Sequence, residues 1–225
     1  MTPPAWDVFV VGSLILVLGV LVLARQSASL LGAREAPLAE LSRPALSLNV
    51  AVSHGLILAL VGLLLWWTDV PVHTLGVETL PDWRWLVGLS ILLVAGNETA
   101  DRLARTVGRA ANPLRERLTP ETGVEWAVLA LLVLPLIAVT EEVLFRGLLI
   151  GAFSVGTPIP PHLLVVGAAV PFGLAHTAQG RLGVGVASVL GVALGAVYFW
   201  SGNLWLVIGA HYLVDLVEFV RHAGD

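Results

Sequence analysis

The chain has 225 residues, of which 57% are hydrophobic and only 12% are charged, and its mean hydropathy is +0.88. Soluble domains carry about 25% charged residues, so this composition favours a membrane protein. The formal net charge of −4 gives no electrostatic basis for binding nucleic acid. The absence of cysteine excludes disulfides, thiolate catalysis and cysteine-ligated metal sites.

Seven apolar segments follow one another, and most approach the roughly 20 residues that a bilayer-spanning helix needs. They are residues 7–24, 46–67, 84–97, 124–153, 162–179, 183–200 and 204–221. The fourth is long and contains Pro135, so an eighth span is the alternative if this proline divides it. The sequence therefore predicts an all-α, polytopic transmembrane helix bundle of about seven spans, forming one integral membrane domain over residues 1–225.

The distribution of arginine predicts the orientation of these spans. All twelve Lys and Arg residues are arginine, and ten of them occupy the first, third and fifth connections and the C-terminal end, while Arg146 lies inside the fourth segment. The second, fourth and sixth connections have none, and Arg84, on the outer flank of the third span, is the exception. By the positive-inside rule, we expect a plasma-membrane protein with its N-terminus outside and its C-terminus in the cytoplasm. An eighth span would break this alternation.

Two local patterns divide the chain further. Residues 98–119 mix arginine with apolar residues at helical spacing, which predicts a cytoplasmic amphipathic helix at the membrane surface. It separates the N-terminal spans, residues 1–97, from a helical core over residues 124–221. In the sixth segment Ala187, Gly191 and Gly195 recur four apart, a spacing that favours close helix packing. The abundance of glycine in the chain explains this stripe equally well.

Ionisable side chains inside a bilayer cost roughly 2.5–3.5 kcal/mol each even on lenient scales, so they need a reason. In this chain they gather in the last four segments, as Glu141, Glu142, Arg146, His176, His211, Asp215 and Glu218. Two pairs have the i,i+4 spacing that places both side chains on one helix face: Glu142 with Arg146, and His211 with Asp215. Glu141 is turned about 100° from Glu142 and has no local partner.

If the fourth, fifth and seventh helices meet, one polar pocket forms from Glu141, His176, His211 and Asp215. A carboxylate with two imidazoles suits the activation of water by a general base, and it also suits zinc. No GxSxG or HExxH motif is present, which argues against a serine hydrolase and a zincin. A purely structural clamp is the alternative interpretation of the pair Glu142 and Arg146.

Three short stretches also resemble the motifs of a known family. They are EEVLFRG from Glu141, FGLAH from Phe172 to His176, and HYLVD from His211 to Asp215. They are similar to the EExxxR, FxxxH and HxxxN/D motifs of the CPBP intramembrane proteases, the CAAX-protease and bacteriocin-processing (Abi) family. The order and separations agree, and the resemblance covers about residues 126–216. The first three spans show nothing comparable, and they vary in this family.

The resemblance implies an all-helical bundle with its active site inside the membrane. Well-known members cut prenylated CAAX proteins after the lipidated cysteine, and some bacterial members serve bacteriocin maturation or self-immunity. By motif, Glu141 would be the base that activates water, and His176 would help to hold that water or a metal. His211 and Asp215 would stabilise the oxyanion or complete the site. The supporting residues would be Glu142, Arg146 and Phe172.

The cofactor stays open, since both a metal-dependent and a metal-free, glutamate-dependent mechanism are compatible with the resemblance. A metal would be zinc, held by Glu141, His176 and His211. Asp215 stands where the motif also allows asparagine, and an ionised aspartate can only accept hydrogen bonds. Asp215 would therefore be protonated, ligate a metal or orient His211, and the i,i+4 spacing favours the last of these.

The sequence thus predicts an intramembrane endopeptidase that cleaves a membrane-embedded or lipidated peptide or protein, with the lipid bilayer and no nucleic acid as partners. One alternative is a non-enzymatic membrane immunity or scaffold protein that has kept the motifs. The other is an ion-coupled transporter, which also needs buried ionisable side chains. No inverted repeat is evident in the sequence to support the transporter.

Overall fold

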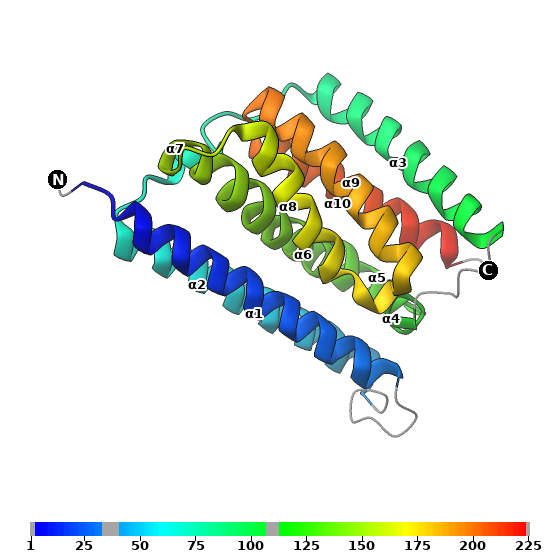
Figure 1. Ribbon diagram of the computed structural model, residues 1–225. Coiled ribbons are helices and arrows are strands. Elements are labelled where there is room, and N and C mark those ends of the chain that lie inside the picture. Colours follow the sequence, from blue (N-terminus) through cyan, green and yellow to red (C-terminus); the bar gives the residue numbers. More distant parts are fainter. Residues whose placement is uncertain (1–2, 33–40, 107–112, 224–225) are drawn as a thin grey trace.

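The computed structural model describes residues 3–32, 41–106 and 113–223, and within these ranges the chain forms helices and no strand (Figure 1). The all-α prediction is confirmed. The helices are α1 Trp6–Gly32, α2 Arg43–Thr68, α3 Trp83–Thr106, α4 Pro113–Leu118, α5 Gly123–Val128, α6 Leu134–Glu142, α7 Phe153–Gly156, α8 Pro161–Ala175, α9 Gly180–Ser201 and α10 Leu204–His222.

Each of the seven predicted apolar segments corresponds to one helical stretch of the described chain. Four stretches are long and apolar enough to cross a membrane: Trp6–Ser29, Arg43–Thr68, Gly123–Gly156 and Thr177–Ser201. A shorter apolar helix, Pro161–Ala175, lies between the last two. The chain is therefore an integral membrane protein, while the number of seven spans stays a prediction.

The long fourth segment is not divided. Helices α5, α6 and α7 form one continuous helical stretch, Gly123–Gly156, joined by two π-helical turns at Leu129–Val133 and Val143–Ala152. Pro135 lies in the first turn of α6, directly after the first π-helical stretch. A proline ring crowds the preceding turn of a helix, and the wider π-helical ladder provides the room.

The third helix is longer than predicted. Helix α3 runs to Thr106, so the first part of the predicted amphipathic segment 98–119 continues α3 instead of starting a separate helix. The chain has neither proline nor glycine between Asn97 and Thr106 to end the helix. Asn97 and Glu98 also hold this extension against α10, through Glu218 at 3.3 Å and Arg221 at 3.0 Å. Residues 107–112 lie outside the described residues, and α4 follows them.

The helices form three groups (Figure 1). Helices α1 and α2 form an antiparallel pair on one side, and α3 lies against α10 on the opposite side. The helices α5–α10 occupy the middle, where α8 packs on α9 and α6 packs on α10. The three predicted motifs all lie on this central group.

The predicted small-residue stripe on α9 is a real packing surface. Ala187, Gly191 and Gly195 are all buried. A Cβ atom on Gly191 would lie 3.1 Å from Cδ1 of Phe172 and 3.2 Å from Cβ of Ala169, both on α8. The stripe therefore lets α9 approach α8 closely, and it sets the position of Phe172 beside the motif residues.

We expect Gly191→Leu to lower the apparent stability of the purified protein by about 2 kcal/mol, because the added side chain overpacks the contact between α8 and α9. Gly185→Leu is the matched control, since Gly185 lies on the same helix and a Cβ atom there would meet nothing within 4 Å. Thermal unfolding in detergent measures both variants. Equal melting temperatures for the two would contradict the close-packing interpretation.

Candidate active site

His176 follows the end of α8, one residue beyond Ala175, and is not inside a helix as the segment 162–179 predicted. Its backbone N–H donates to Gly173 O at 3.0 Å, which leaves the carbonyl of Phe172 free. The imidazole Nδ1 donates to that carbonyl at 2.8 Å. A carbonyl only accepts, so Nδ1 carries the hydrogen and Nε2 is the ring nitrogen left for other contacts.

The buried carboxylate of Glu142 connects its own motif, EEVLFRG, with the HYLVD motif. Its Oε1 accepts from Arg146 Nη1 at 2.8 Å and from His211 Nδ1 at 2.7 Å. Arg146 Nη2 donates in addition to Gly191 O on α9 at 3.2 Å. Glu142 and Arg146 are almost completely buried, at 0% and 1% exposed. A buried charge needs a partner, so this cluster neutralises the guanidinium and ties three helical segments together.

The i,i+4 spacing correctly predicted the pair of Glu142 and Arg146. It gave no indication that His211 also bonds Glu142, because that contact depends on how α10 is placed against α6. The spacing favoured Asp215 as the residue that orients His211. In the structure, Glu142 bonds Nδ1 of His211, and Asp215 Oδ2 lies 3.5 Å from the other ring nitrogen, Nε2.

Phe172 is the common apolar surface beneath these groups. The guanidinium of Arg146 lies over its ring, with Cζ 4.3 Å from the centroid. The rings of His176 and His211 lie 4.9 Å and 6.0 Å from it, centroid to centroid. Phe145 closes the other side with an edge-on contact at 5.3 Å. One aromatic side chain therefore positions a cation and both imidazoles.

Glu141 lies between the two imidazoles without bonding either. Its Oε2 is 3.9 Å from Nε2 of His176 and 3.8 Å from Nε2 of His211. These distances are too long for hydrogen bonds, and among the described residues this buried oxygen has no hydrogen-bond partner. A single water molecule can bridge polar atoms at such a separation.

The structure thus brings together the four residues that the sequence singled out: Glu141, His176, His211 and Asp215. The side chains of Glu141, His176 and Asp215 are 18–24% exposed, while that of His211 is 4% exposed. Glu218, on the same helix as His211, bonds Asn97 of α3 instead. The arrangement is chemically suited to hold and polarise water, and the catalytic roles of these residues stay predictions.

The donor types around Glu141 fit zinc, but their spacing fits it poorly. Zinc–ligand bonds of 2.0–2.2 Å in a tetrahedral site place ligand atoms about 3.4 Å apart. Here Glu141 Oε2 is 3.8 Å and 3.9 Å from the two imidazole nitrogens. Within the part of the chain that the structure describes, no group of three His, Cys, Asp or Glu residues is placed to hold a metal ion. The zinc site stays a prediction.

Comparison with known families supports the resemblance that the three motifs indicate. Residues 123–217 match the family model described as Type II CAAX prenyl endopeptidase Rce1-like. This match supports the resemblance of residues 123–217 to the CPBP family of CAAX proteases. No curated protein and no solved structure matches the chain. The matched segment contains all three motifs, and the CAAX-protease family supports an intramembrane protease with a membrane-associated peptide as its substrate.

Glu142→Gln should destabilise the fold much more than Glu141→Gln. Removing the charge of Glu142 leaves Arg146 buried without a counter-ion, which costs about 3 kcal/mol or more. Glu141 makes no hydrogen bond through Oε2 among the described residues, so its variant should unfold within a few degrees of wild type. Thermal unfolding in one detergent measures both variants. A loss of similar size for the two would contradict the assignment of Glu142 as the structural carboxylate.

Proposed function

We propose that the protein is an intramembrane endopeptidase that hydrolyses a peptide bond of a membrane-embedded or lipidated peptide or protein, of the prenylated CAAX type. The observation that carries the proposal is the position of Glu141 Oε2, buried and 3.8–3.9 Å from two imidazole nitrogens. A carboxylate oxygen without a hydrogen-bond partner among the described residues is suited to take a proton from a water molecule.

The first step is activation of that water. One O–H of the water donates to Glu141 Oε2 and the other donates to Nε2 of His176. Nε2 of His176 is an acceptor because Nδ1 keeps its hydrogen on the carbonyl of Phe172. Glu141 takes the proton as general base, and the resulting hydroxide attacks the carbonyl carbon of the scissile bond. Two fixed acceptors leave the oxygen lone pairs of the water directed away from them, toward the substrate.

The next step is stabilisation of the oxyanion. Nδ1 of His211 is held by Glu142, so a proton that His211 gives or receives is on Nε2. When Nε2 carries a hydrogen, it can donate to the oxyanion, and Glu142 compensates the positive charge of the ring. Asp215 lies beside Nε2 and limits how far the ring can turn. Glu141 then returns its proton to the amide nitrogen, the C–N bond breaks, and a carboxylic acid and an amine leave.

The zinc prediction uses the same donors in another way. A zinc ion on Glu141, His176 and His211 would polarise the substrate carbonyl and lower the pKa of its bound water. The steps derived above need no metal, so chelation separates the two mechanisms.

The arginine pattern supports a plasma-membrane location with a cytoplasmic C-terminus as part of this proposal.

Glu141→Gln should reduce cleavage by about 10²- to 10⁴-fold, because the amide cannot accept the proton of water. The assay uses the full-length protein in detergent with a fluorogenic lipidated CAAX peptide beside an unlipidated one. His54→Gln is the control, since His54 bonds the carbonyl of Val50 on α2, away from the site. A chelator-treated sample of wild type runs in parallel.

Activity that survives chelation and is lost in Glu141→Gln supports the metal-free mechanism, whereas loss in both supports zinc. An active Glu141→Gln protein would overturn the assignment of the base. A wild-type protein that cleaves neither peptide would contradict a CAAX-type substrate.

Asp215→Asn should retain activity within about tenfold of wild type. Glu142, rather than Asp215, holds Nδ1 of His211, and an asparagine amide can still donate a hydrogen bond beside Nε2. Asp215→Leu, which removes every polar atom of the side chain, should lose considerably more. The same peptide assay measures kcat and KM for both. If Asp215→Asn were as inactive as Glu141→Gln, the charge of Asp215 would be essential and the role given to Glu142 incomplete.

A further inference from the structure

Tryptophan marks one end of the bundle. Of the eight tryptophans, seven lie at the end where α1 and α3 begin and α2 and α9 finish; they are Trp6, Trp66, Trp67, Trp83, Trp85, Trp200 and Trp205. The eighth, Trp126, lies at the start of α5. Five of the seven are strongly exposed, at 64–79%. Exposed tryptophan gathers where a membrane meets water, so these seven residues, the tryptophan end, place this part of the protein at lipid headgroup level.

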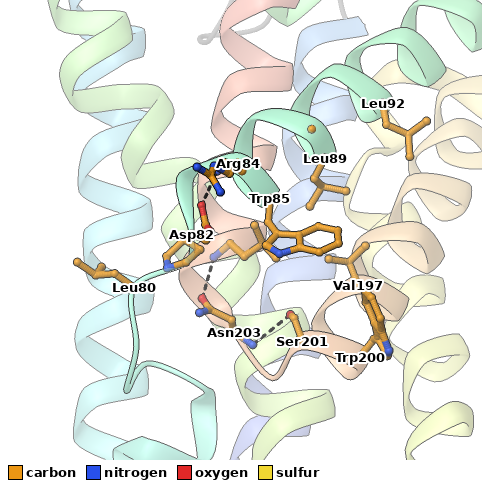
Figure 2. A pocket seen from close by; sticks show the side chains of 13 residues that line it. Leu80, Asp82, Arg84, Trp85, Leu89, Leu92, Val197, Trp200, Ser201 and Asn203 are labelled. Carbon is orange, nitrogen blue, oxygen red and sulfur yellow. Dashed lines mark hydrogen bonds between the residues drawn. The ribbon is translucent and has the colours of Figure 1, made fainter.

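A cavity of about 940 Å³ opens at the tryptophan end, between the start of α3 and the turn from α9 to α10 (Figure 2). Its walls are mainly apolar and include Trp85, Leu89, Leu92, Val197, Trp200 and Leu206. Trp85 and Trp200 meet edge to face across it, with ring centroids 6.2 Å apart. The volume lies within the range of ligand-binding cavities, and the lining is that of a site for a hydrocarbon chain.

A cation stands at the rim of this cavity. Arg84 is exposed in the first turn of α3, and it is the exception to the predicted pattern of outer connections without basic residues. The nearby carboxylate of Asp82 accepts a hydrogen bond from the backbone N–H of Arg84 at 2.9 Å (Figure 2). Among the described residues, the guanidinium of Arg84 forms no salt bridge, and its closest ring contact, to Trp83, is 5.7 Å. Its charge is therefore available to an anion at headgroup level.

We propose that this cavity binds one anionic glycerophospholipid of the adjoining leaflet, with an acyl chain between α3 and α9 and its phosphate on Arg84. The three observations are complementary: the tryptophans give the depth, the apolar walls accept the chain, and Arg84 matches the phosphate. The inference does not depend on protease activity.

The position of the lipid has a consequence for α10. At this end α3 packs tightly on α10, where a Cβ atom on Gly209 would lie 2.8 Å from Cδ1 of Leu86. Leu206, in the cavity wall, lies about one and a half turns before His211 on the same helix. The bound lipid fills the space beside this contact and holds α3 against the helix that carries His211.

Two glycines on α3 provide a matched pair of variants. A Cβ atom on Gly88 or on Gly96 meets nothing within 4 Å, so leucine fits at both positions. Gly88 lines the cavity and Gly96 does not. Gly88→Leu therefore narrows the cavity, while Gly96→Leu changes the same helix in the same way elsewhere. Arg84→Gln removes the cation, and Arg25→Gln, on α1, is its charge control.

The experiment reconstitutes full-length protein in nanodiscs of phosphatidylcholine with a minor fraction of phosphatidylglycerol. Native mass spectrometry then counts the lipids that each variant retains. Wild type, Gly96→Leu and Arg25→Gln should retain one phosphatidylglycerol in preference to phosphatidylcholine. In Arg84→Gln, the ratio of retained phosphatidylglycerol to retained phosphatidylcholine should fall about fivefold. Gly88→Leu should retain less lipid than Gly96→Leu, because the added side chain takes up part of the acyl-chain space. Added phosphatidylglycerol should raise the melting temperature of Gly96→Leu and not of Gly88→Leu.

Three results would overturn the proposal. Equal lipid retention by Gly88→Leu and Gly96→Leu would show that the cavity is not the site. Wild type without preference for phosphatidylglycerol would show that the site does not select a lipid with a net negative headgroup. Displacement of the lipid by inorganic phosphate alone would show a site for free phosphate. If Gly88→Leu fails to fold, Arg84→Gln against Arg25→Gln decides alone.

Discussion

The carboxylate of Glu142 is the interaction on which the polar interior depends. One oxygen, Oε1, accepts hydrogen bonds from Arg146 on its own helical stretch and from His211 on α10. Arg146 extends the connection to the backbone of Gly191 on α9. Because the cluster is buried, separating it exposes uncompensated charge to an apolar surrounding. A single acidic side chain therefore fixes the relative position of three helical segments and the proton-bearing nitrogen of His211.

The adjacent glutamate, Glu141, lies outside the hydrogen-bonded cluster that Glu142 Oε1 forms. Neighbouring residues of a helix point about 100° apart, and the two consecutive carboxylates lie beside different nitrogens of His211. Glu142 faces the guanidinium, and Glu141 faces the Nε2 atoms of His176 and His211. Each imidazole is held from behind, one by a backbone carbonyl and the other by Glu142. The rings are thus fixed before a substrate arrives, which is what positioned catalysis requires.

The features that depend on residue spacing within one segment were predicted from the sequence. The pair of Glu142 and Arg146 and the small-residue stripe follow from a spacing of four residues, and the helical nature of the seven segments follows from the length of their apolar runs. The bond from His211 to Glu142 depends on the rotation of α10 against α6, which no local pattern encodes. The end of α8 was predicted too late because a side chain, the imidazole of His176, donates to the carbonyl of Phe172 in the last turn, and Gly180, with φ of 73°, begins the next helix.

The early end of α8 bears on the supply of water to a site surrounded by lipid. A hydrolase consumes one water molecule in each turnover, and the hydrocarbon core of a bilayer offers almost none. His176 lies in the turn between α8 and α9, where an apolar helix has finished and the chain reverses. Its side chain is partly exposed there, at 19%. In the proposed mechanism, this turn would be the place at which water reaches Glu141 without crossing the apolar layer.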